Sequence, residues 1–137
     1  MKSVAIFFLM IFFLQAQARP CDCLDKIHFL SIVADADLEQ AYYREAHDVA
    51  YYHGRIDAMS TAYFQVFQSN DECRCYQIVA KLSQKAGDSL DQAQRYSHWP
   101  GDTWYWLGAC HAYADILKSL CSPLLLTNKV TCETSIR

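Results

Sequence analysis

The chain has 137 residues, a formal net charge of −3 at pH 7, seven cysteines and 14% aromatic residues. This length suits one domain of ordinary size. It contains no cluster of about five to eight basic residues, which argues against nucleic acid as the main partner.

The first residues have the pattern of a secretory signal peptide. Lys2 precedes an apolar run over residues 4–14, and a small-residue A-x-A end follows at Ala18. A membrane span needs about 20 apolar residues, so the run is too short to cross a bilayer. We therefore expect a signal peptide over residues 1–18, a single domain over 19–137, no membrane span, and secretion to the extracellular space or to a bacterial periplasm.

Two helices are predicted in the first half of this domain. Apolar residues recur every three or four positions over residues 24–33 and again over 38–66, which indicates amphipathic helices. Asp35 can cap the second helix, so a break is expected near residue 35. Gly54 costs that helix about 1 kcal/mol relative to alanine, which is too little to end it.

Two more helices are predicted in the second half. Ser69 has the spacing of a capping box for a helix over residues 72–97, and Asn70 and Asp71 are further cap candidates. The turn around Pro100 ends this helix, because proline lacks a backbone donor. A fourth helix follows, capped by Asp102 or Thr103 and ending near Cys121.

These elements predict an all-α, disulfide-stabilised domain that resembles a four-helix bundle with up-down-up-down topology. The residues after Pro123 have a β-like composition, and we expect a short extended C-terminal arm held by Cys132. The segments beginning at Tyr51 and Trp104 look alike but do not recur at a fixed period, so no internal repeat is expected.

Cysteines dominate the candidate chemistry. All seven follow the predicted signal peptide, and in an oxidising compartment such usage favours disulfides. The C-x-C spacing is tighter than that of usual zinc sites, and the C-x-x-C of redox centres is absent. Binding of a soft metal ion by four thiolates stays an alternative. The expected disulfide cysteines are Cys21, Cys23, Cys73, Cys75, Cys121 and Cys132. Cys110 lies on an apolar helical stripe and is the candidate free thiol.

The predicted topology suggests a pairing but also raises an objection to it. The first and third helices start at the same end of such a bundle, so the two C-x-C pairs should be joined at least once. A first helix over 24–33 would nevertheless be much shorter than a second over 38–66, at about 1.5 Å per residue. Its start would then lie too far from the third helix, unless the second helix bends near Gly54.

Catalytic motifs are absent from the sequence. His53 with Asp57 and His111 with Asp115 are spaced four apart, but the Glu-x-x-His pattern of di-iron bundles does not occur. Cys110 and its neighbour His111 cannot face each other on a helix. No nucleophile, zinc-protease or phosphate-loop motif is present. We predict no catalytic residue, no metal site, no cofactor and no enzymatic activity.

Aromatic residues on the second predicted helix, off its main stripe, and around the turn before the fourth helix are the candidate binding surface, since tyrosine and tryptophan are enriched at interfaces. The candidates are Tyr43, Tyr51, Phe64, Trp99 and Trp104. The function predicted from these residues is binding of another protein or self-association. The alternatives are a carrier of a small apolar ligand between the helices and soft-metal binding through the C-x-C pairs.

Overall fold

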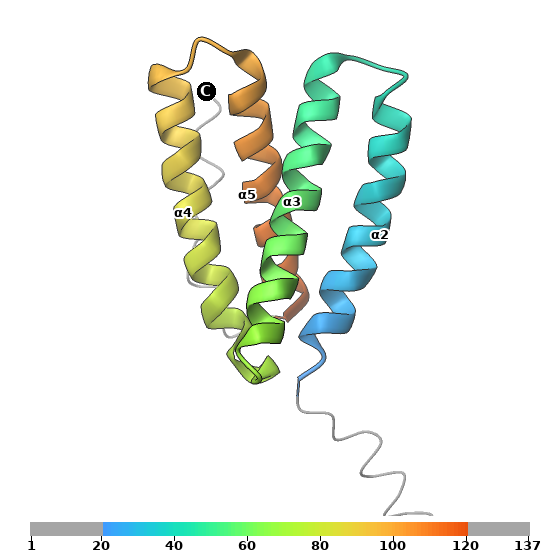
Figure 1. The fold of residues 1–137 in the computed structure, drawn as a ribbon, viewed down its shortest axis with the longest axis vertical. Coiled ribbons are helices and arrows are strands. Elements are labelled where there is room, and N and C mark those ends of the chain that lie inside the picture. Colours follow the sequence, from blue (N-terminus) through green and yellow to red (C-terminus); the bar gives the residue numbers. More distant parts are fainter. Residues whose placement is uncertain (1–20, 121–137) are drawn as a thin grey trace, which may run out of the picture.

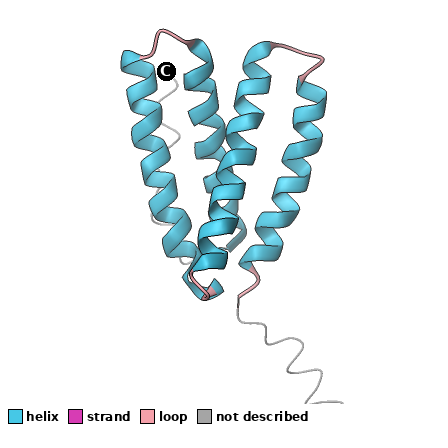
Figure 2. Cartoon of the chain, in the orientation of Figure 1, coloured by secondary structure: helices cyan, strands magenta, loops and turns pink. Residues whose placement is uncertain are grey.

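A computed structural model describes residues 21–120 of the chain. Within them the chain is helical and has no strand, as predicted (Figures 1 and 2). The elements are α2 (Cys23–Ala41), α3 (Ala46–Gln68), the short 3-10 helix η1 (Glu72–Arg74), α4 (Cys75–Tyr96) and α5 (Pro100–Leu120). The predicted signal peptide and C-terminal arm lie outside the described residues.

The helices form two antiparallel hairpins, α2–α3 and α4–α5, which run up-down-up-down (Figure 1). The central contact of the molecule is between α3 and α5, while α2 packs chiefly on α3 and α4 packs chiefly on α5. Both hairpin turns lie at one end, here called the loop end. The other end holds the starts of α2 and α4 and is here called the cysteine end.

The predicted break near residue 35 is wrong. The first helix continues through Asp35 to Ala41, with Ala34 buried in the core, so Asp35 caps nothing. Its 19 residues nearly match the 23 of α3, giving lengths of about 29 and 35 Å. The objection to joining the C-x-C pairs therefore disappears.

The helix starts in the second half also differ from those predicted. Ser69 does not form a capping box, because its hydroxyl donates to the Val66 carbonyl at the end of α3. Asp71 instead accepts from the Cys73 N–H and caps η1. At the next boundary α5 begins at Pro100, a first-turn position where the missing donor costs nothing. Asp102 therefore lies inside the first turn.

Two glycines allow α3 and α5 to cross with their backbones in contact. A Cβ atom added to Gly54 would overlap the backbone carbonyl of Tyr105, and one added to Gly108 would overlap that of Tyr51. The two contacts are reciprocal: each Y-x-x-G segment places its glycine on the tyrosine of the other. Gly54 is thus a packing residue at the centre of the molecule rather than a weak point of its helix.

The reciprocal crossing belongs to a wider repeat between the two hairpins. The buried residues of α2 are Cys23, Ile27, Ala34 and Ala41. Buried residues also occur 52 positions later, the separation of the cysteines in each disulfide, at Cys75, Val79, Ala86 and Ala93 of α4. Because α4 continues past Ala93 to Tyr96, Pro100 follows Ala93 by seven positions whereas Ala46 follows Ala41 by five, so the spacing between corresponding residues changes from 52 to 54. A search at one fixed period misses the repeat for this reason.

Candidate functional site

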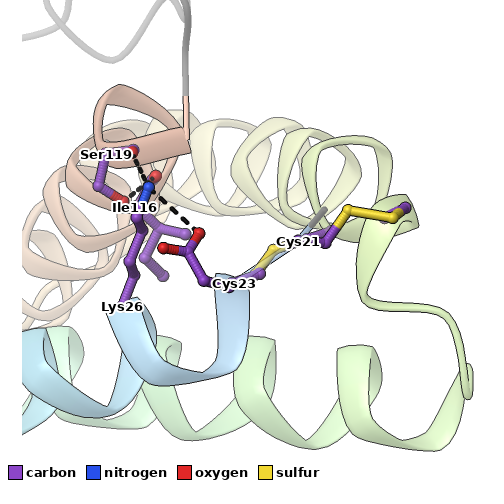
Figure 3. Close-up of polar contacts among 8 residues, drawn as sticks. Cys21, Cys23, Lys26, Ile116 and Ser119 are labelled. Atoms are coloured by element: carbon purple, nitrogen blue, oxygen red, sulfur yellow. Dashed lines mark hydrogen bonds and ion pairs between the residues drawn. A yellow bond between two sulfur atoms is a disulfide. The ribbon is translucent and has the colours of Figure 1, made fainter. Parts of the chain in front are cut away.

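The cysteine end holds two parallel disulfides between the hairpins. Cys21 is joined to Cys73 and Cys23 to Cys75, with Cα–Cα distances of 5.3 and 6.3 Å. Figure 3 shows the bridge of Cys23 at the start of α2 and that of Cys21 just before it. The predicted joining of the two C-x-C pairs is therefore present twice.

The other cysteines have different environments or are not described. Cys110 belongs to neither bridge and is buried among the core residues of α5. Cys121 and Cys132 lie outside the described residues. Between residues 21 and 120, no group of three or more His, Cys, Asp or Glu residues is arranged to hold a metal ion.

A polar cluster lies beside the glycine crossing, between α3 and α5. The hydroxyl of Tyr51 shares a 2.7 Å hydrogen bond with Nδ1 of His111. Arg55 donates from Nη2 to Oδ2 of Asp115 at 2.6 Å, and its guanidinium lies 5.9 Å from the centre of the Tyr51 ring. These contacts join the first hairpin to the second.

The electrostatics of this cluster keep its phenol neutral and its guanidinium charged. Burial raises the pKa of Tyr51, against the opposing effect of Arg55. Burial alone would lower the pKa of Arg55, but the bond to Asp115 and the neighbouring Tyr51 outweigh it and raise that pKa. Both shifts favour the protonation states in which Tyr51 bonds to His111 and Arg55 pairs with Asp115, so they support the contacts between α3 and α5.

A second polar contact mirrors the first across the crossing. Tyr105 donates its hydroxyl hydrogen to Oδ2 of Asp57 at 2.7 Å. Burial, followed by this bond to a carboxylate, raises the pKa of Tyr105 strongly. His53 shares a hydrogen bond with Tyr42 instead. The four-apart pairs His53–Asp57 and His111–Asp115, considered from the sequence as ligand pairs, thus each have their members engaged with other residues.

The loop end carries an exposed set of aromatic side chains from both hairpins, here called the aromatic surface. Its members are Tyr42, Tyr43, Tyr96, Trp99 and Trp104. Tyr43 is 89% exposed and Trp99 is 69% exposed. The ring of His47, in the first turn of α3, lies 4.8 Å from that of Trp104 on α5. This contact joins the start of α3 to the start of α5 at the loop end.

The five candidate binding residues do not all lie together. Tyr43, Trp99 and Trp104 belong to the aromatic surface. Tyr51 is half-buried in the polar cluster, and Phe64 is exposed near the end of α3 that leads to the cysteine end. The sequence marks all five only as aromatic residues near predicted turns or off the stripe of the second helix, and the packing separates the exposed residues from those in helix contacts.

A shallow apolar groove lies at the cysteine end, between the first turns of α2 and the last turn of α5. It has a volume of about 370 Å³ and is lined by Asp25, Lys26, Phe29, Leu30 and Ser119. Lys26 donates from Nζ to the Ser119 carbonyl at 2.8 Å and pairs with Asp22 at 3.3 Å (Figure 3). Sequence reasoning missed this groove, because it forms between residues far apart in the chain.

Comparisons with models of protein families, with curated proteins and with solved structures find no match for this chain. None of the helices over residues 21–120 is long and apolar enough to cross a membrane.

Proposed function

We propose that this chain is an exported, disulfide-linked helical protein that binds another protein through the aromatic surface at its loop end. Two observations support export. The chain starts with a signal-peptide pattern, and four of its cysteines are joined in disulfides, which persist in oxidising compartments.

The observation that carries the binding proposal is the exposure of Tyr43 and Trp99 on neighbouring hairpin turns. Large aromatic side chains that stay in water at one end of a molecule mark interaction sites, since their burial by a partner is favourable. The α3–α5 contact and the disulfides hold both turns on one rigid frame. A surface held in place before binding loses little conformational entropy when the partner arrives.

The alternative functions have weaker support. Soft-metal binding needs four thiolates, and the described C-x-C cysteines are joined in disulfides. The apolar groove beside α2 is a surface feature next to α5 rather than a site between the helices of the core. Self-association remains compatible with the aromatic surface, and the test below distinguishes it from binding of another protein.

Site-specific photo-crosslinking in the source tissue or culture tests the proposal. A benzophenone side chain replaces Tyr43 or Trp99, and in a matched control it replaces Gln92, an exposed residue on α4. We expect the same crosslinked protein from positions 43 and 99 and none from position 92. The yield from position 43 should fall at least about tenfold in Trp99→Ala, the loss typical of a hot-spot residue. Equal yields from all three positions would contradict a binding surface, and a crosslink to the chain itself would identify self-association.

A further inference from the structure

The apolar groove continues into an uncovered face of α2. Phe29 is 65% exposed, and Ile32 and Val33, three and four residues later, share its side of the helix. All three point away from the core, which α2 contacts through Ile27 and Ala34. An apolar stripe on the outer side of a helix usually has a partner, because leaving it in water forfeits the free energy of burial.

The second hairpin shows that the fold does not require this stripe. By the 52-residue correspondence between α2 and α4, Phe29, Ile32 and Val33 correspond to Lys81, Gln84 and Lys85. Those three residues are exposed and polar or charged, as an outer helix face should be. The apolar residues on this face of α2 are therefore not required by the design that the two hairpins share, and they indicate a contact made by the first hairpin alone.

The last turn of α5 lies beside this face of α2. Ser119 lines the groove itself, and Lys26 of α2 binds its carbonyl oxygen, so α5 ends against the first turns of α2 (Figure 3). The residues that follow α5 read Cys-Ser-Pro-Leu-Leu-Leu, with the leucines at 124–126. Four residues span at most about 14 Å, so Leu124 can reach the groove directly from Leu120.

We propose that the apolar segment over residues 123–126 docks in the groove between α2 and α5 and covers Phe29. Because proline is unfavourable inside a helix, we expect the chain to leave the direction of α5 before Pro123. A segment attached so close to the groove has an effective concentration in the millimolar range, which favours it over a free partner or a second copy for so small a site. The cysteine end is then closed by the chain itself, and the aromatic surface at the loop end stays open for a partner.

Nuclear Overhauser contacts in the oxidised protein, with residues 121–137 present, test the docking directly. We expect contacts between the methyl groups of Leu124–Leu126 and the ring of Phe29. A sample that mixes labelled and unlabelled chains separates contacts within a chain from contacts between chains. Contacts only between chains would assign the face to a second copy and overturn the proposal, and so would leucine methyl groups with no contact to α2.

Limited trypsin digestion gives a second, independent measurement. Cleavage after Lys129 should accelerate at least about tenfold in Phe29→Ser and in Leu125→Ser, because the first removes an apolar side chain from the groove and the second removes one from the docked segment. Phe64→Ser is the matched control, since Phe64 has a similar exposure on α3 but lies outside the groove lining. An unchanged rate in Phe29→Ser, with native disulfides and helical content, would overturn the proposal. This result is independent of crosslinking at positions 43 and 99.

Discussion

At the scale of single residues, Tyr113 shows how burial controls protonation in the core. Its side chain on α5 is only 6% exposed. The pKa of Tyr113 is raised to about 12, chiefly by burial. A hydrogen bond with Thr61 lowers this pKa in part, and Cys110 and Asp57 raise it further. The folded protein therefore holds this phenol neutral at pH values where an unfolded chain, with a tyrosine pKa of about 10, would ionise it.

The raised pKa predicts a loss of stability at alkaline pH. The contribution of Tyr113 is fully present below about pH 10 and is lost as the pH rises from about 10 towards 12. Urea unfolding at several pH values should show the free energy of unfolding falling across this window. In Tyr113→Phe the fall should be shallower but not absent, because the pKa of Tyr105 is raised as well. Identical pH profiles for the two proteins would contradict this assignment.

Tyr43 and Tyr51 have different environments that the sequence could not distinguish. Tyr43 and Tyr51 are both tyrosines near the start of the same predicted helix and off its main stripe. One is exposed on a turn, and the other is bonded to His111 across the α3–α5 contact. The difference depends on a residue 60 positions away, and no local pattern contains that information.

At the scale of elements, the close crossing of α3 and α5 decides the architecture. The sequence predicts both helices from their three-to-four periodicity, yet treats Gly54 as a small local cost. In the structure this glycine and Gly108 permit backbone contact between the helices. The local cost of glycine is offset by closer packing, which is a tertiary effect.

Alanine substitutions at the glycines test this interpretation. Gly54→Ala and Gly108→Ala should each destabilise the protein by about 1–3 kcal/mol or more, because the new Cβ meets backbone atoms that cannot rotate away. Gly87→Ala on α4 is the matched control, since its Cβ would meet nothing within 4 Å. That variant should gain up to about 1 kcal/mol from helix propensity. Chemical unfolding measures all three, and a stable Gly54→Ala would rule out the close crossing.

At the scale of the whole molecule, two hairpins of similar design over residues 21–120 are held by one central contact and by the two disulfides described at the cysteine end. Both bridges constrain the same pair of segments, so they should be redundant in the unfolded chain. Their environments differ: Cys23 and Cys75 are 1% and 2% exposed, whereas Cys73 is exposed. Removing the Cys21–Cys73 bridge should therefore lower the free energy of unfolding only slightly. Removing both bridges should lower it by much more than the sum of the two single losses.

Paired alanine variants measure this redundancy. Cys21→Ala with Cys73→Ala should lower the free energy of unfolding by less than about 1 kcal/mol, because the remaining bridge still closes the loop. Removing both bridges should cost about 4 kcal/mol, the loop entropy expected for a separation of 52 residues. Unfolding in urea, compared with the unsubstituted oxidised protein, gives both values. If each bridge removed alone cost the same and the two losses added up to that of the double removal, the bridges would not share one constraint.

The sequence by itself determined the all-α class, the four helices and the presence of C-x-C pairs at the starts of the first and third. These features depend on residues close together in the chain, where periodicity and turn chemistry act directly. The tertiary structure alone decided that α2 continues past Asp35, that the glycines face a partner helix, and that α5 ends beside α2. Each of these depends on contacts between distant segments, because the free energy of burying a side chain depends on what packs against it.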